Sequence, residues 1–329
     1  MRGMVLAPLM SSGLRLAAAL SGTPGLVVLT YHRVLAAPDP LLPSEPDTTT
    51  FRTQLAFLAR HLRVLPLSEA LQRLQAASLP QCAVSITFDD GYANNYTCAL
   101  PVLRSLGLPA TVFVATGYLN GGCMWNDGVI ETFRRCRKPQ LDLRPLGLEP
   151  DLGQHMLASD DQRRAGMTAV INALKYRPLA ERTAVVNQMA RLAEVRLPED
   201  LMLTSDELRD LHRKGIEIGG HTVNHPILAR IEPEEARREI TAGAAQLAAI
   251  TGEQPRLFAY PNGRPGTDFG PEHAEMVRDA GFTHALTTES GLGRRSTDPY
   301  RLPRIALWSR SAPRLAASLM SFYVRSRAA

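Results

Sequence analysis

Short apolar runs that alternate with helical patterns constrain the fold of this chain more than any other feature. The runs are rich in β-branched residues, and the stretches between them carry apolar residues at helical spacing. Strands that are apolar on both faces suit a parallel sheet with helices outside it. The predicted strands are 25–31, 83–88, 110–115, 216–219, 256–260, 283–288 and 302–307. The helices predicted between them are 51–62, 68–74, 101–106, 205–214 and 233–250.

The alternation breaks between residues 117 and 203, which predicts an insertion between the third and fourth strands. Most of the insertion is predicted to be helical, over 128–137, 160–174 and 180–196. Residues 139–150 hold three prolines and no sustained periodicity, so they are predicted to be a loop. Inserted segments on a barrel commonly line or cover the site, and we expect this one to influence substrate preference.

The length of 329 residues exceeds that of most single domains, but barrels of alternating strands and helices reach it as one unit. We therefore expect an N-terminal extension over 1–24, one α/β barrel over 25–310 and a basic C-terminal helix over 311–329. That helix either packs on the barrel, which we favour, or makes a peripheral contact with a membrane. No apolar run reaches 18 residues, so a transmembrane helix is not expected.

The charge pattern limits the classes of partner. A net charge of +5 and a pI near 9.2 permit attraction to nucleic acid or anionic lipid. The arginines are scattered, however, and no basic block is interleaved with aromatic residues, so we expect no nucleic-acid partner. The four cysteines lack metal-site spacing. We expect a cytoplasmic location or one at the inner face of the membrane. A weak signal-peptide pattern leaves an exported form open, and no oligomeric state is indicated.

Paired aspartates follow the second predicted strand, in the sequence Thr87-Phe88-Asp89-Asp90-Gly91-Tyr92. Neighbouring side chains on a strand point to opposite faces, so both carboxylates serve one site only where the strand ends and the chain turns. A glycine supplies such a turn. By themselves, two such aspartates are more often a polar turn at a strand end, with one of them capping the next helix.

Paired histidines, His221 and His225, follow the fourth predicted strand. The proline after His225 disfavours a helix at that position, so we expect an ordered loop that lets the two rings converge. Alone, the pair is more often structural. Together with the two aspartates it forms the side-chain set of a metal hydrolase, in which three ligands leave a position for water and a second carboxylate is free for proton transfer.

These motifs, and Pro261-Asn262-Gly263 after the fifth strand, form a set that resembles the polysaccharide deacetylase family (carbohydrate esterases with a NodB homology domain). The resemblance covers roughly residues 25–307, with the insertion over 117–203 outside it. It implies a distorted (β/α)7 barrel that hydrolyses N-acetyl or O-acetyl groups on glycans. It also implies one divalent metal, with zinc as the expected ion.

Carried over by position, the resemblance assigns roles to particular side chains. It implies Asp89 as the general base, and Asp90, His221 and His225 as the metal ligands. The family's general acid is a histidine that usually lies near the C-terminal end, where this chain has none. In a circularly permuted branch, which includes poly-N-acetylglucosamine deacetylases, it arrives on an N-terminal strand. His32, after the first strand here, is therefore the expected acid, although a strand-end histidine with only local hydrogen bonds is the alternative.

The chain also departs from the family at the third motif. Many members have an arginine there that steadies the base aspartate, whereas the equivalent position here is Ala259. We expect Arg264 or Arg304 to replace it. The predicted substrate-binding residues are Tyr92, Tyr260, Pro261 and Asn262, with Asp268 and Trp125-Asn126-Asp127 as weaker candidates for the rim of the site.

These assignments predict an N-deacetylase that acts on an N-acetylated glycan or a lipid-linked saccharide. Two alternatives stay open at this point. One is a glycan-binding domain that kept the barrel without the chemistry, although such a domain has no need of a base. The other is a zinc amidase for a non-sugar amide, which would use the same ligands.

Overall fold

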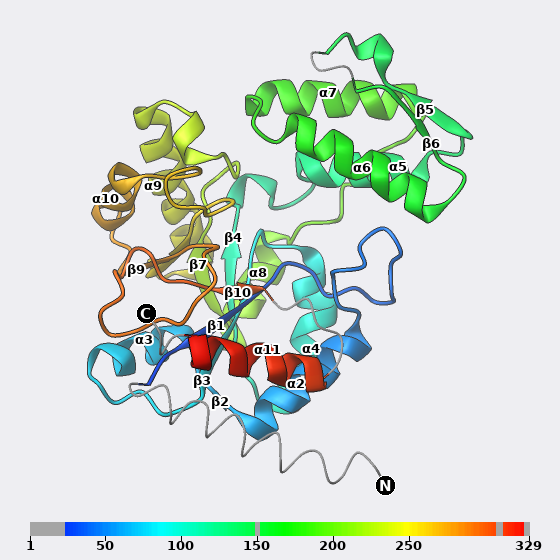
Figure 1. The fold of residues 1–329 in the computed structure, drawn as a ribbon. Helices are drawn as coiled ribbons and strands as arrows, with labels where there is room; N and C mark the ends of the chain where they lie inside the picture. Colours follow the sequence, from blue (N-terminus) through cyan, green and yellow to red (C-terminus); the bar gives the residue numbers. More distant parts are fainter. Residues whose placement is uncertain (1–23, 149–151, 307–311, 326–329) are drawn as a thin grey trace, which may run out of the picture.

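A curved parallel sheet forms the centre of the molecule (Figure 1). The computed structural model describes residues 24–148, 152–306 and 312–325. The order of strands along the sheet is β10-β1-β3-β4-β7-β8-β9, with β2 paired to β3, and every pairing within it is parallel. The strands are β1 (Val27–Tyr31), β2 (Arg63–Val64), β3 (Ala83–Phe88), β4 (Thr111–Val114), β7 (Glu217–Gly220), β8 (Leu257–Ala259), β9 (His284–Leu286) and β10 (Ile305–Ala306).

The segment that ends in β10 brings the two edges of the sheet together. Ile305 and Ala306 pair with β1 at one edge, and Leu302 forms a parallel bridge with Leu286 of β9 at the other. The sheet thus curls into a distorted (β/α) barrel, as expected. All seven strands predicted from the sequence are present, whereas the two-residue strand β2 was not predicted because it is too short to show a periodicity.

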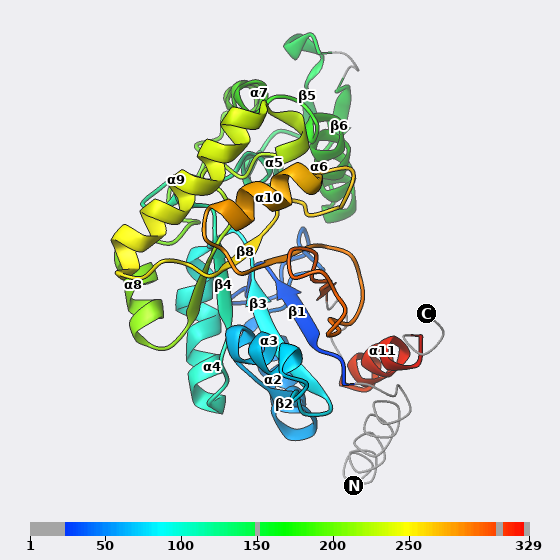
Figure 2. The ribbon, with the colours of Figure 1, turned by 90° about the vertical axis from the view of Figure 1, so that its left-hand side faces the viewer.

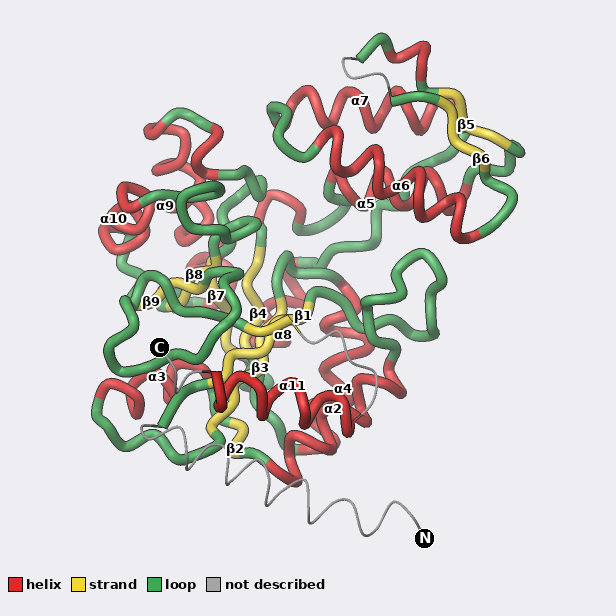
Figure 3. Tube along the Cα trace, viewed as in Figure 1, coloured by secondary structure: helices red, strands yellow, loops and turns green. Residues whose placement is uncertain are grey.

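Helices surround the sheet and bury their apolar faces against it (Figures 2 and 3). They are α2 (Thr48–His61), α3 (Leu67–Gln75), α4 (Leu100–Leu106), α8 (Ser205–Arg213), α9 (Pro233–Thr251), α10 (Pro271–Asp279) and α11 (Ala312–Arg325). α11 packs on α2, and its Leu315 and Leu319 are fully buried in the main core. No helix in the described part of the chain has the length and apolar character needed to cross a membrane.

The insertion lies between β4 and β7 and has a hydrophobic core of its own (Figure 1, upper right). Its helices are α5 (Trp125–Arg135), α6 (Asp160–Leu174) and α7 (Leu179–Leu192). The prediction of a plain loop over 139–150 was wrong, because β5 (Gln140–Asp142) forms an antiparallel pair with β6 (Gln154–Met156). Three-residue strands leave too little alternation to be recognised from the sequence. The boundaries predicted for the extension, barrel and terminal helix stay predictions, and residues 1–23 lie outside the described part.

Candidate active site

The carboxyl ends of three strands of the sheet, β1, β3 and β7, open into one pocket of about 390 Å³. His32 follows β1, Asp89 and Asp90 follow β3, and His221 begins the loop after β7. Because these strands are parallel, their ends meet at the same edge of the barrel, and the pocket is lined by all four of these residues and by His225. The residues predicted from separate motifs therefore share one site.

The end of β3 places two adjacent carboxylates in that pocket. Asp90 and Gly91 both have positive φ, of 75° and 87°, and so turn the chain directly after Asp89. The amide of Gly91 donates to the carbonyl of Asp89 at 3.0 Å. Asp89 and Asp90 are 3% and 7% exposed, and neither carboxylate caps a helix in the described part of the chain. The backbone turn, and not a helix cap, therefore accounts for the two adjacent aspartates.

Asp90, His221 and His225 form a set of possible metal ligands. Their ligand atoms all lie within 4.8 Å of one another. The Nε2 atoms of His221 and His225 are 3.3 and 3.4 Å from Oδ1 of Asp90. Two imidazole nitrogens and one carboxylate oxygen form a donor set that suits zinc or a similar divalent ion and leaves a coordination position open. The residues present therefore fit the metal that the sequence motifs imply.

The imidazole of His221 is held in one tautomer by the barrel. Its Nδ1–H donates to the carbonyl of Ala259 on β8 at 2.6 Å. A carbonyl only accepts, so Nδ1 carries the proton and Nε2 is left as the ligand atom. For His225, burial lowers the pKa to about 4, with Asp90 opposing that effect and His221 adding to it. The ring of His225 is thus suited to coordinate as a neutral imidazole at neutral pH.

The loop that carries the two histidines is strained and braced. Thr222 and His225 have φ of 66° and 52°, and a β-branched residue in this region is uncommon. No helix forms here, as expected from the proline at 226. The carboxylate of Glu239 on α9 accepts from the amides of Val223 and Asn224 at 2.9 and 2.7 Å. This buried carboxylate holds the loop in the shape that brings the rings together.

Asp89 is paired with Arg304. The two guanidinium Nη atoms donate to the two carboxylate oxygens at 2.7 Å each, and the Nε of Arg304 donates to the carbonyl of Thr287 at 3.0 Å. Arg304 is 2% exposed. The alternative that Arg264 holds Asp89 was wrong, because Arg264 is exposed and its amide donates to Asp268.

The charges in the pocket shift the pKa values of Asp89 and His32 in opposite directions. Burial acts to raise the pKa of Asp89, but Arg304 and His221 outweigh it and the pKa is lowered. For His32, an exposed residue of the pocket wall, loss of hydration acts to lower the pKa, but the carboxylates of Asp90, Asp89 and Glu45 outweigh it and the pKa is raised. The site thus favours a charged carboxylate at 89 and a protonated imidazole at 32.

The predicted substrate-binding residues divide into two groups. Tyr92, Tyr260 and Asn262 line the pocket, as do Trp125, Asn126 and Asp127 from the insertion. Pro261 is buried and does not belong to the pocket wall. Asp268 was wrongly placed at the rim: it is 0% exposed and accepts from a backbone amide within its own turn.

The comparisons with known proteins agree with this site. The family model described as "Polysaccharide deacetylase" matches residues 76–141 and 149–285, which is more than half of the chain. The chain belongs to the polysaccharide deacetylase family. The matched ranges run through most of the insertion, so the expectation that the insertion lies outside the family resemblance was wrong.

Individual known proteins are similar to this chain over about nine tenths of its length. YxkH of Bacillus subtilis (strain 168), assigned by name to the polysaccharide deacetylases, is 20% identical over 303 residues, covering 92% of this chain and 76% of that protein. IcaB from Ammonifex degensii is 22% identical, with a TM-score of 0.60, covering 90% of this chain and 97% of that one. The Streptococcus pyogenes deacetylase PplD, in complex with acetate, is 18% identical, with a TM-score of 0.59, covering 90% and 99%. These structures confirm the fold.

Two carboxylates that line or support this pocket were not predicted from the sequence. Glu45, in the loop after β1, lines the pocket, and its carboxylate accepts from the amide of Arg33 at 3.2 Å. No pattern marks it. Glu239 could have been found, because it lies within the apolar stripe of α9, next to buried Ile240 and one turn after buried Ala236. A carboxylate on the buried face of a helix indicates a specific partner.

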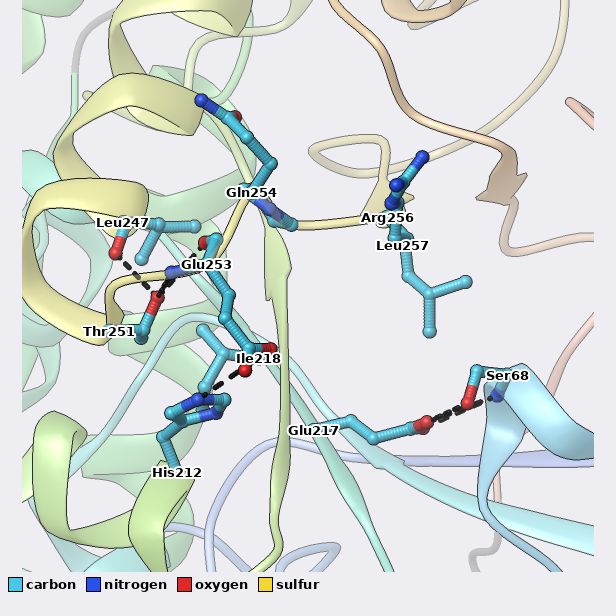
Figure 4. Close-up of a pocket in the computed structure, with 11 residues that line it drawn as sticks. Ser68, His212, Glu217, Ile218, Leu247, Thr251, Glu253, Gln254, Arg256 and Leu257 are labelled. Carbon is cyan, nitrogen blue, oxygen red and sulfur yellow. Dashed lines mark hydrogen bonds and ion pairs between the residues drawn. The ribbon is translucent and has the colours of Figure 1, made fainter.

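A second pocket, of about 210 Å³, lies at the opposite ends of the strands (Figure 4). Its Glu217, at the start of β7, accepts from the amide of Leu67 at 2.9 Å and from the hydroxyl of Thr111 at 2.8 Å, and it also contacts Ser68. The carboxylate thereby caps the first turn of α3, whose N-cap residue is a proline. This pocket has a structural explanation and does not belong to the family's site.

Proposed function

We propose that this polysaccharide deacetylase hydrolyses N-acetyl groups on a glycan or glycolipid. The observation that supports the proposal most strongly is the presence of two differently held carboxylates in one pocket. Asp90 lies among the imidazoles, whereas Asp89 is turned to Arg304. One carboxylate can thus hold a cation while its neighbour takes a proton, which is the division that amide hydrolysis requires.

Asp90, His221 and His225 would hold one divalent metal, and zinc is the ion that we propose. When bound, such an ion supplies Lewis-acid chemistry: it polarises the acetyl carbonyl and makes water a better acid. The second coordination shell is already present in the chain. It consists of the carbonyl of Ala259 behind His221 and of Glu239 behind the loop.

Asp89 would act as the general base. Arg304 keeps its carboxylate charged and oriented, so it is ready to take the proton of the attacking water. The backbone N–H of Tyr92 would donate to the oxyanion, since it has no acceptor among the described residues. A base contributes roughly 10²- to 10⁴-fold to such a reaction, and an oxyanion donor roughly 10²- to 10³-fold.

His32 would act as the general acid. Its imidazole is favoured in the protonated form by the surrounding carboxylates and stands in the pocket wall on the β1 side. It would deliver a proton to the amide nitrogen as the C–N bond breaks. Water supplies the oxygen, and the products are acetate and a free amino sugar. Tyr260, Asn262 and Trp125 would bind the sugar rings through aromatic and polar contacts.

The test is acetate release from N-acetylglucosamine oligomers, peptidoglycan fragments and lipid-linked N-acetylated saccharides by the metal-loaded protein. We expect release from at least one class, loss of turnover with retained metal in Asp89→Asn, and loss of both in His221→Ala. Metal content is measured on the same samples. A protein that binds glycan and metal but releases no acetate would be a binding domain, and release from non-sugar amides alone would identify an amidase instead.

A further inference from the structure

A buried polar cluster connects the insertion to the two strand ends that carry the proposed machinery. The hydroxyl of Tyr92, after β3, donates to the carboxylate of Asp127 on α5, with distances of 3.1 and 3.3 Å to its two oxygens. Nη1 of Arg33, after β1, lies 3.6 Å from Oδ1 of Asp127. The guanidinium of Arg33 also stacks over the ring of Tyr92, 4.8 Å from its centre. Three segments far apart in the sequence thus meet at one carboxylate.

The residues next to this cluster are those to which the proposed function assigns chemistry. Arg33 directly follows His32, the proposed acid, and Tyr92 supplies the proposed oxyanion donor two residues after Asp90. Any shift of the Arg33 or Tyr92 side chain would therefore be transmitted to the backbone of a reacting group. Misplacement of such groups by about 1 Å can cost on the order of 10²-fold in rate.

Asp127 is buried against residues of the barrel, whereas Glu131, also buried, pairs with Arg134 and Arg135 on its own helix. Asp127 is 1% exposed, whereas Asp142 on β5 of the same insertion is half-buried and pairs with Arg144 beside it. Burial raises the pKa of Asp127 to about 7, with Arg33 acting to lower it and Asp90 to raise it. A buried carboxylate of this kind costs stability unless its partners compensate, so its place beside the site requires a reason.

We propose that Asp127 is a positioning residue, through which the insertion orients Tyr92 and Arg33 and thereby the proposed oxyanion donor and the His32 segment. The inference rests on the proposed function and adds a role for the insertion to it. Asp127 itself does not touch the ligand set. Its effect should appear in the chemical step more than in substrate binding, because the groups that it holds act on the transition state.

The experiment compares Asp127→Asn, Tyr92→Phe and the double variant in the metal-loaded enzyme, with Asp142→Asn as the matched control on the insertion. We expect each single variant to lower kcat by about 10- to 100-fold while KM changes by less than about threefold. Because Asp127→Asn weakens the same hydrogen bond that Tyr92→Phe removes, the double variant should be no slower than the slower single one. Metal content should stay at the wild-type level, and Asp142→Asn should match the wild type.

Several outcomes would overturn the inference without touching the proposed function. These are an unchanged kcat in Asp127→Asn, a rise in KM alone, which would indicate direct contact with substrate, or multiplicative losses in the double variant. If Asp127→Asn fails to fold, the inference is tested with Tyr92→Phe, which removes only one hydroxyl. The kcat of Tyr92→Phe must then fall while its KM stays unchanged. A wild-type protein that releases no acetate would refute the proposed function itself.

Discussion

At the scale of single residues, the pairing of Asp89 with Arg304 determines how the proposed base responds to pH. The two Nη groups of Arg304 donate to the two carboxylate oxygens of Asp89, and its Nε donates to the carbonyl of Thr287. A planar guanidinium held at three points orients the carboxylate as well as neutralising it. Lysine could reproduce the charge but not the orientation.

We predict that Arg304→Met moves the acidic limb of the pH–rate profile to higher pH and lowers kcat at least about tenfold. The pKa of Asp89 is lowered in the folded protein, so the carboxylate stays charged as the pH falls. Without Arg304, burial dominates and the pKa rises, so the base becomes protonated at a higher pH. The measurement is kcat/KM for acetate release as a function of pH.

Arg304→Lys is the matched control for this prediction. It keeps the charge, so the acidic limb should move less than in Arg304→Met, while the loss of orientation still lowers kcat. If the acidic limb of the pH–rate profile of Arg304→Met lies at the same pH as in the wild type, Asp89 is not the group whose protonation produces that limb.

Several of these residues could be predicted from the sequence, and others could not. The motifs identified Asp90, His221 and His225 because these residues occur at fixed places after strands. The choice between Arg264 and Arg304 could not be made, because it depends on where the last strand lies next to β1. The contact between Asp127 and Tyr92 was not foreseen, because it depends on how the insertion folds back onto the barrel.

At the scale of elements, helix α9 supports the histidine loop through a single buried side chain. Glu239 accepts from two consecutive backbone amides and from the side-chain amide of Asn224 at 2.7 Å. Gly243, one turn later, leaves little room for a side chain, since an added Cβ would lie 3.0 Å from the carbonyl oxygen of Thr222. The helix and the loop are therefore fitted to each other.

We predict that Glu239→Gln weakens metal binding about 10- to 100-fold while the fold is kept. A glutamine has one acceptor oxygen, and its NH₂ group would face an N–H donor, so the loop loses part of its support. The affinity is measured by competition with a chromophoric chelator. Glu235→Gln is the control, because Glu235 lies exposed on the same helix. Equal affinities in the two variants would mean that the loop keeps its shape without Glu239.

Prediction of the elements depended on their length. The five-residue β1 and the six-residue β3 have apolar runs that are visible in the sequence, and α6 begins and ends where its periodicity predicts. The hairpin of β5 and β6 was missed because three-residue strands between prolines resemble a loop. Helix α10 was also not predicted, although Pro271 at its first position is a known start signal.

At the scale of the whole molecule, the proposed metal site connects distant parts of one barrel. Asp90 follows β3, whereas His221 and His225 follow β7, and β4 lies between these strands in the sheet. The ligand atoms come together only when the sheet has curled, so an unfolded chain has no comparable site. A bound ion should therefore stabilise the folded barrel as a whole.

We predict that zinc raises the thermal midpoint of the chelator-treated protein, by roughly 5 to 10 °C at a free concentration about 100 times Kd. That concentration corresponds to about 2.7 kcal/mol of stabilisation, and 1 kcal/mol shifts the midpoint of a large domain by roughly 2 to 4 °C. Asp90→Asn and His225→Ala should lose the shift, which is measured by differential scanning calorimetry.

The Asp89→Asn variant distinguishes the proposed roles of Asp89 and Asp90 in the same measurement. Because Asp89 is turned to Arg304 and not to the imidazoles, its variant should keep the zinc-dependent shift of the midpoint, although it cannot turn over substrate. Loss of the shift in Asp89→Asn together with its retention in Asp90→Asn would exchange the roles of the two carboxylates. The structure opposes that exchange, since the carboxylate of Asp90 lies 3.3 and 3.4 Å from the two ring nitrogens.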